Sequence, residues 1–205
     1  MARDLQPIVK MSRREGYALH PKAHKALVKR PTPPGQQAAN ARPTKPSQYA
    51  MQLREKQKVK RLYGLLERQF AKLMKEASRR PGRSGEILLQ MLETRADNTV
   101  YRAGFAPSRR AARQLVSHGH FLLNGNRIDI PSIQVRSGDV LQFRPHSLKS
   151  EYFKNLEETS PAPSTTPSWL KVNRKKGEVS VVALPTRDDA ELDINEQLIV
   201  EYYSR

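Results

Sequence analysis

The side chains of this chain that could do chemistry gather between Arg95 and Gly125, in the stretch RADNTVYRAGFAPSRRAARQLVSHGHFLLNG. Arginine, histidine and asparagine dominate its polar residues, and Asp97 is its one acid. A guanidinium group donates hydrogen bonds in a fixed fork that matches a phosphate. Several such groups on one compact scaffold are typical of a nucleic-acid-binding surface.

A catalytic role for the same stretch is the alternative, with Asp97 as a lone acid. An RNA-modifying enzyme would need a catalytic constellation elsewhere, yet the chain has no cysteine nucleophile and no phosphate-binding glycine loop. We therefore expect no enzymatic activity and predict that Asp97 pairs with an arginine or caps the chain locally. Modification of RNA by the protein would favour the enzyme, and stoichiometric binding alone would favour the structural protein.

A metal site is not expected. His20 and His24 are four positions apart, but Pro21 interrupts them and no further ligands accompany them. The absence of cysteine removes disulfides and thiolate zinc sites. The sequence therefore predicts neither a metal ion nor a cofactor.

Two short helices and a strand must position the basic residues. The first helix carries Val100 and ends at Gly104, and Pro107 and Ser108 start the second, which we expect over residues 108–118. Gly119 follows the second helix at the position where a glycine in left-handed backbone geometry commonly caps the C-terminal end. The residues expected to face a core are Ala111, Ala112, Leu115 and Val116, and those expected to project outward are Arg109, Arg110 and Arg113. Phe121 to Leu123 then predict a strand, and Asn124-Gly125 a hairpin turn.

The rest of the chain is predicted as helices before this stretch and short strands after it. Ser47 opens a helical region with a break at Gly64, and Ser84 caps a further helix. Strands are expected around Ile128 to Val135 and at Val140 to Phe143, then a short helix at Leu148, Tyr152 and Leu156. A hairpin is expected at Trp169 to Val172 and Val179 to Leu184, with Trp169 in the core and not a platform for bases. At the end, Asp193 and Glu196 predict a capping box.

The composition favours a polyanionic partner. The chain has 37 Lys and Arg against 20 Asp and Glu, a formal net charge of +17, and 37% hydrophobic residues. Basic side chains that neutralise phosphates release counterions and bind without a large apolar surface. No apolar run is long enough to span a bilayer and no secretory signal is visible. We therefore expect a nucleic acid as the partner, no membrane association and a cytoplasmic location.

The first 46 residues hold seven of the fifteen prolines, ten basic residues and two acids. Without sustained apolar periodicity, such a segment is expected to be flexible when alone and to fold onto RNA as an arm. A solvated tail is the alternative. The basic run Arg54 to Arg61 could likewise be only a solvated helix face, although it continues the arm.

These residues resemble a known family. The stretch from Arg95 to Gly125 is similar to the small RNA-binding module named after ribosomal protein S-four, which some pseudouridine synthases and tyrosyl-tRNA synthetases also carry. The whole chain resembles the bacterial-type ribosomal family itself, in its cysteine-free form. The matching segments, in order, are SRREG from Ser12, QLREKQKVKRLYG from Gln52, LERQF from Leu66, ARQLVSHG from Ala112 and INEQLIVEYYSR from Ile194.

The resemblance implies a structural protein of the small ribosomal subunit. Such a protein binds a multi-helix junction in the 5′ domain of the small-subunit ribosomal RNA and nucleates assembly. It contacts ribosomal proteins numbered five and twelve, lies near the mRNA where it enters, and contributes to translational accuracy. A free translational repressor of its own mRNA is a further alternative. Some relatives carry a cysteine zinc cluster in the arm, and its absence here again predicts no zinc.

The predicted fold is α+β: a discontinuous helical domain with an inserted RNA-binding module, formed by a helix-turn-helix-like pair and a small antiparallel sheet. The expected boundaries are a flexible basic arm at 1–46, a helical domain at 47–93 completed by 191–205, the module at 94–158, and a loop and hairpin extension at 159–190. The candidate RNA-binding residues are Arg3, Lys10, Arg13, Arg14, Lys22, Lys25, Arg54, Lys56, Lys58, Lys60, Arg61, Arg79, Arg80, Arg83, Arg109, Arg110, Arg113, His118, His120, Asn124 and Arg127.

Overall fold

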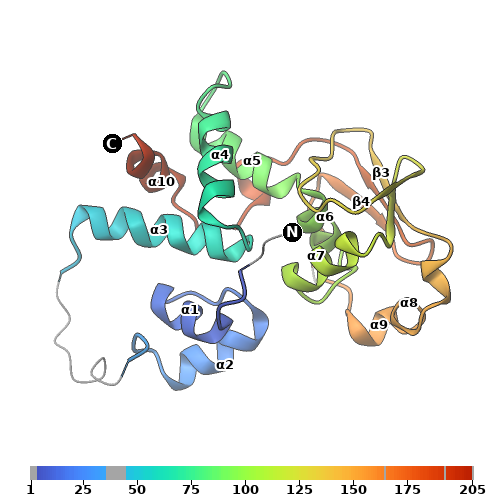
Figure 1. Cartoon of the computed structure of the whole chain (residues 1–205), viewed down its shortest axis with the longest axis horizontal. Helices are drawn as coiled ribbons and strands as arrows, with labels where there is room; N and C mark the ends of the chain where they lie inside the picture. Colours follow the sequence, from blue (N-terminus) through green and yellow to red (C-terminus); the bar gives the residue numbers. More distant parts are fainter. Residues whose placement is uncertain (1–3, 36–44, 164, 192, 205) are drawn as a thin grey trace. The chain divides into compact units, whose positions relative to one another are not determined.

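The computed structural model describes residues 4–35, 45–163, 165–191 and 193–204. The chain forms two compact units (Figure 1). The helical unit comprises Met1–Leu88 and Asp193–Arg205, and the sheet unit comprises Leu89–Leu192. Helices and one antiparallel sheet together confirm the predicted α+β class.

The helical unit is built around buried apolar faces of its longer helices. Its helices are α1 (Ile8–Glu15), α2 (Pro21–Lys29), α3 (Gln48–Leu62), α4 (Glu67–Ala77), the first part of α5 (Ser84–Glu93), and α10 (Glu196–Tyr203). As predicted, the helical region opens at Ser47, which caps α3: its Oγ accepts a hydrogen bond from the Ala50 amide at 3.2 Å. Val59 of α3 and Phe70 and Met74 of α4 are buried in the core of this unit.

The structure adds two helices to the segment predicted as a flexible arm. Within residues 4–35, Met11 of α1 and Ala23 of α2 are buried, and the His20 side chain caps α2. The Glu15 side chain is fully buried and forms ion pairs with Arg54 and Arg61 of α3. Burial raises the pKa of Glu15, and the two guanidinium groups offset part of that rise. These contacts with α3 stabilise helices that local composition alone does not predict. Residues 1–3 and 36–44 of the predicted arm lie outside the described residues.

The C-terminal helix α10 packs along α3, as Figure 1 shows. It buries Ile199, and Gln52 of α3 donates a hydrogen bond to Glu201 at 2.8 Å. The predicted capping box of Asp193 and Glu196 is wrong. Asn195 is the cap, because the helix starts at Glu196 and the side-chain Oδ1 of Asn195 accepts hydrogen bonds from the Gln197 and Leu198 amides at 3.1 and 3.4 Å.

The sheet unit holds five antiparallel strands in the order β2-β1-β3-β5-β4. The strands are β1 (Phe121–Leu123), β2 (Asn126–Ile128), β3 (Val140–Phe143), β4 (Leu170–Asn173) and β5 (Glu178–Val181). The other elements are α6 (Ala96–Arg102), α7 (Arg109–Ser117), η1 (Ser147–Lys149), α8 (Glu151–Lys154), α9 (Leu156–Thr159) and η2 (Arg187–Asp189). Because β3 pairs with β5, the late hairpin and the earlier strands belong to one sheet.

The local signals around α7 and β1 are confirmed. The Ser108 hydroxyl accepts a hydrogen bond from the Ala111 amide at 3.2 Å and caps α7. Gly119 has a φ of +71° after the end of that helix. Asn124 and Gly125 both have positive φ, +50° and +82°, as the predicted two-residue hairpin requires.

Two predictions for the later segments are wrong. Of the residues predicted as strands around Ile128 to Val135, only Ile128 lies in a named strand, and Ile130 is exposed. The single short helix predicted at Leu148 to Leu156 is divided into η1, α8 and α9. Ser150 is extended, with a ψ of 149°, and Asn155 also leaves helical geometry. These two residues interrupt the helical hydrogen bonds.

Aromatic rings form the centre of the sheet unit. Phe143 contacts Phe105 and Phe121 edge-on, with ring centroids 4.6 and 5.3 Å apart. Trp169 is 1% exposed, which confirms its predicted place in the core. Ala112 and Val116 of α7 are fully buried, so the predicted inward face of that helix is correct. The polar side of α6 and α7 is thereby held in a fixed orientation.

Candidate nucleic-acid interface

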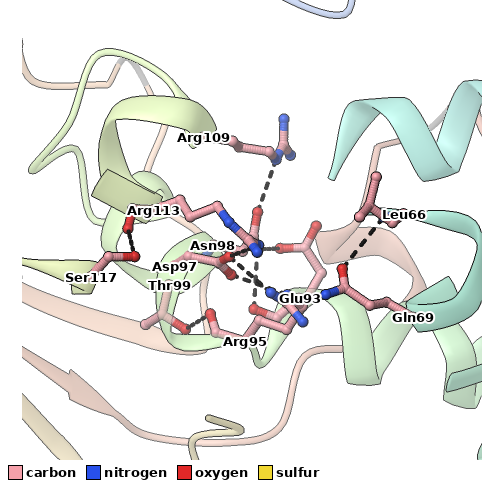
Figure 2. Close-up of polar contacts among 10 residues, drawn as sticks. All are labelled: Leu66, Gln69, Glu93, Arg95, Asp97, Asn98, Thr99, Arg109, Arg113 and Ser117. Carbon is pink, nitrogen blue, oxygen red and sulfur yellow. Dashed lines mark hydrogen bonds and ion pairs between the residues drawn. The ribbon is translucent and has the colours of Figure 1, made fainter. Parts of the chain in front are cut away.

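The polar side of α6 and α7 is a buried charge cluster and not an open basic face (Figure 2). Arg95 precedes α6 and donates two hydrogen bonds to Asp97, from Nε at 3.1 Å and from Nη2 at 2.9 Å. Arg113 of α7 donates to the same carboxylate at 3.2 Å. Arg95 and Asp97 are each 5% exposed. Asp97 therefore has the pairing role that we predicted for it.

Asn98 joins the cluster to Glu93 and to α7. Its Nδ2 donates to the Glu93 carboxylate at 2.7 Å, and its Oδ1 accepts from Nε of Arg109 at 2.9 Å. Arg102 donates two further hydrogen bonds to Glu93, at 2.9 and 2.7 Å. A buried carboxylate needs such partners, because an isolated charge in the interior is costly. Four arginines thus help to hold the module together from within.

Two candidate residues of α7 consequently differ from their predicted placement. Arg109 and Arg113 are predicted to project outward, but their side chains are only 12% and 11% exposed. Arg110 on the same helix is exposed. The sequence shows the basic type of all three residues but not the acids that two of them pair with, because Asp97 and Glu191 lie 16 and 82 positions away.

The remaining candidates of the sheet unit lie at the end of α7 and in the first hairpin. His118 and Arg127 are exposed, and the Arg127 guanidinium lies against Gly119. His120 contacts the Ser147 hydroxyl at 2.9 Å. Burial lowers the pKa of His120, and His118 and Arg144 lower it further. Asn124 bonds the Asp139 carboxylate and the Val140 amide, which fixes the hairpin.

The basic run of α3 is largely engaged in ion pairs within the helical unit. Arg54 and Arg61 pair with Glu15, Lys56 and Lys60 with Glu67, and Lys58 with Glu55. Lys56 is 3% exposed and lies over the Tyr202 ring, 4.6 Å from its centroid. The ion pairs of this run therefore stabilise the fold of the helical unit. Lys56 in particular is not on the surface, which is a correction to its place among the candidates.

The candidates of the first two helices and of the loop after α4 are more accessible. Exposed positions are held by Lys10, Arg14, Lys22, Lys25, Arg79, Arg80 and Arg83. Arg80 and Arg83 pair with Glu76 and Glu86. Arg13 differs, because its guanidinium donates to the carbonyls of Arg30 and Thr32 at 3.3 and 3.1 Å and so joins α1 to the segment after α2. Arg3 lies outside the described residues.

The structure shows a basic stripe on α4, of which only the last residue, Arg79, is among the candidates predicted from the sequence. Arg68, Lys72 and Lys75 are exposed at helical spacing, and Arg79 continues the line beyond the helix. The opposite face of α4 buries Phe70, Met74 and Ala77. Within the part of the chain that the structure describes, none of the four basic side chains is in an ion pair. The recurrence of cations every three to four residues is the signal that would have identified Arg68, Lys72 and Lys75.

Neither a cation site nor a membrane span is found among the described residues. Nδ1 of His20 accepts a hydrogen bond from the Lys22 amide at 3.0 Å, so this ring caps α2. Within the described ranges, no three His, Asp or Glu side chains come together as a cation site would need. No helix there combines the length and the apolar composition that a bilayer span requires.

Comparisons with known proteins identify two domain families along the chain. Residues 3–93 match the family described as "Ribosomal protein S4/S9 N-terminal domain", and residues 94–141 match the "S4 domain". Similar proteins over their full length are the "Small ribosomal subunit protein uS4" of Roseiflexus castenholzii (50% identical over 206 residues), of Chloroflexus aurantiacus (52% over 206) and of Clostridioides difficile (48% over 211). Each alignment covers 100% of both chains. The chain therefore belongs to the family of small ribosomal subunit protein uS4.

Proposed function

We propose that this chain is a structural RNA-binding protein of the small ribosomal subunit. The observation that supports it most directly is the exposed basic stripe of Arg68, Lys72, Lys75 and Arg79. The stripe lies in a chain that is 50% identical to a small ribosomal subunit protein uS4. Exposed cations without acidic partners retain their full attraction for phosphate. The ion-paired cations of α3 and of the charge cluster instead fix the shape of the two units.

Exposed cations for binding phosphate, together with ion-paired cations that fix the fold, favour recognition of RNA shape. Rigid surfaces that touch several phosphate backbones position a protein without reading bases, and folded RNA is recognised largely through such backbone geometry. The partner we propose is a multi-helix junction in the 5′ domain of the small-subunit ribosomal RNA, bound early in assembly. The family resemblance of the whole chain supports this choice.

The same proposal includes the location of the protein and its neighbours on the ribosome. We place it in the cytoplasm, bound to the ribosome beside ribosomal proteins five and twelve and near the path of entering mRNA, with an effect on translational accuracy. No catalytic activity is proposed, because Asp97, the candidate acid of the module, is bound by Arg95 and Arg113.

Binding to a transcript of the 5′ domain tests this function. The double variant Lys72→Glu with Lys75→Glu reverses the centre of the stripe, and Lys149→Glu with Lys154→Glu makes the same charge change at exposed positions of the sheet unit. We expect the first variant to lose about tenfold or more in affinity, because charge-assisted hydrogen bonds are among the strongest. The second should lose clearly less.

Two controls complete the test. An unrelated RNA duplex should bind all forms weakly, and the wild-type protein should co-sediment with the small subunit after a high-salt wash. Equal losses in the two double variants would show that net charge alone drives binding. A wild-type protein that binds junction and duplex equally would contradict the proposed function.

A further inference from the structure

We propose that Arg102 and Arg109 form a phosphate-binding site, which the Glu191 carboxylate occupies in the free protein. Oε1 of Glu191 lies 3.0 Å from Nη2 of Arg109 and 3.5 Å from Nη2 of Arg102. One carboxylate oxygen thus bridges two guanidinium groups. A phosphate oxygen of an RNA backbone has the same charge preference and hydrogen-bonding geometry.

Both guanidinium groups are held in place without Glu191. Arg102 makes two hydrogen bonds to the buried Glu93 carboxylate. Arg109 bonds Asn98 through Nε, and its guanidinium carbon lies 4.6 Å from the centroid of the Tyr101 ring. The two arginines therefore keep their orientation when the bridging carboxylate leaves. A ligand that replaces it meets a site that is already organised.

The charges of the cluster favour an anion at this position. Arg95, Arg102, Arg109 and Arg113 carry four positive charges, and Glu93, Asp97 and Glu191 carry three negative ones. Without Glu191 the surplus rises from one positive charge to two. Glu93 and Asp97 are buried, at 0% and 5% exposed, and cannot leave. Glu191 is the acid of the cluster that can be exchanged for a ligand.

Glu191 is also the most accessible member of the cluster. Its side chain is 28% exposed, against 17% for Arg102 and 12% for Arg109. It follows η2 in a segment outside regular structure, whereas both arginines lie on helices. An ion pair that is partly exposed to water contributes little free energy, so an incoming phosphate can displace it at small cost. Glu191 then acts as an internal competitor that weakens RNA binding at this site.

This inference rests on the proposed function for the identity of the ligand as an RNA phosphodiester, but the site itself can be tested with inorganic phosphate. The variant is Glu191→Gln, with Glu191→Asp as a second form that keeps the charge and shortens the side chain. The matched control is Asp188→Asn, because Asp188 is an exposed acid three positions away. The signals followed are the Nε–Hε resonances of Arg102 and Arg109, assigned with Arg→Lys variants.

We expect inorganic phosphate to shift these two resonances at concentrations about two- to fivefold lower in Glu191→Gln than in the wild type, the range set by a partly exposed ion pair. Asp188→Asn should match the wild type, and Glu191→Asp should fall between. With the 5′-domain transcript, Glu191→Gln should gain a similar factor and add roughly 0.7 to 0.9 to the slope of log affinity against log salt.

The two proposals fail in different ways. Equal phosphate titrations for Glu191→Gln and Asp188→Asn, or shifts confined to other arginines, would overturn the site whatever the protein does with RNA. Preferential phosphate binding by Glu191→Gln in a protein that does not select the ribosomal junction would support the site and reject the proposed function.

Discussion

The Tyr203 hydroxyl donates a hydrogen bond to Oε1 of Glu67 at 2.9 Å, between residues 136 positions apart. Lys56 and Lys60 donate to the same carboxylate, at 2.7 and 3.0 Å. Helices α3, α4 and α10 therefore meet at the Glu67 side chain. The return of the chain end to the helical unit is fixed by this polar contact as well as by the apolar face of α10.

Replacing Tyr203 by Phe should lower the free energy of unfolding of the helical unit by about 1 kcal/mol, the net value of a typical hydrogen bond. Urea unfolding followed by circular dichroism measures it. Tyr202→Phe is the matched control, because the Tyr202 hydroxyl makes no hydrogen bond to the described residues. Equal losses for the two variants would show that the Glu67 contact contributes nothing.

Acid should weaken the helical unit through Glu67. Burial raises the pKa of this carboxyl, but hydrogen bonds from Lys56, Lys60 and Tyr203 outweigh it and lower the pKa from 4.5 to about 2. A carboxyl whose pKa is lower in the folded state stabilises the protein above its unfolded pKa. We therefore expect this contribution to be complete above about pH 5 and to be lost progressively as the pH falls to about 2.

The variant Glu67→Gln should remove that part of the pH dependence, and Glu157→Gln, at an exposed position, should not. The measurement is the urea midpoint across a pH series from neutral down to the folded-state pKa for the three proteins. A Glu67→Gln profile that runs parallel to the wild type would contradict the assignment.

Arg113 and Arg110 of α7 should respond in opposite ways to charge reversal. Arg113→Glu places a carboxylate next to buried Asp97, and breaking a buried pair costs roughly 3 to 5 kcal/mol. Arg110→Glu changes an exposed position and should leave stability within about 0.5 kcal/mol. Thermal unfolding measures both. The cluster would have no structural role if the two variants melted together.

Features that a few adjacent residues determine could be predicted from the sequence. Ser47 and Ser108 start helices where expected, and Asn124 with Gly125 turns the hairpin. A cap or a turn depends on residues two or three positions apart, so its signal is complete in the local sequence. The family resemblance, and not a local signal, predicts that the end of the chain packs on the helices before the module, as α10 does on α3.

Whether an individual basic residue is ion-paired or exposed could not be predicted, because its acidic partner is far away in the chain. Arg61 pairs with Glu15 across 46 positions, and Arg109 pairs with Glu191 across 82. Basic residues that stabilise the fold and basic residues that face solvent have the same type and similar spacing. Only the folded structure distinguishes the ion-paired cations of α3 from the exposed basic stripe of α4.

Gly177 should tolerate no side chain. Its φ is +64°, and an added Cβ would lie 2.1 Å from the Phe143 ring, which is buried in the core. Gly177→Ala should therefore lower the free energy of unfolding by several kcal/mol, through backbone strain and overpacking together. Gly125→Ala is the control in a turn of the same unit, since Gly125 has a φ of +82° and open space around it. Similar losses in urea unfolding would mean that the ring contact is unimportant.

The exposed lysines of α2 provide the test of the N-terminal segment. Deleting residues 1–46 would remove Glu15 and leave Arg54 and Arg61 without their partner, so a deletion changes stability as well as binding. The triple variant of Lys22, Lys25 and Lys29 to Gln removes three exposed charges at helical spacing and leaves that ion pair in place. We expect its melting temperature to match that of the wild type.

If these lysines bind phosphates, the slope of log affinity against log salt should flatten by roughly 0.7 to 0.9 for each phosphate that the variant no longer neutralises. The measurement is affinity for the 5′-domain transcript across a salt series. Lys149→Gln with Lys154→Gln is the control at exposed positions of the sheet unit. Selection of the junction over an unrelated duplex should persist in the triple variant, because the rigid surfaces of the sheet unit and of the rest of the helical unit, and not α2, would read the RNA shape. An unchanged slope would show that α2 does not touch RNA, and loss of selection would assign specificity to this segment.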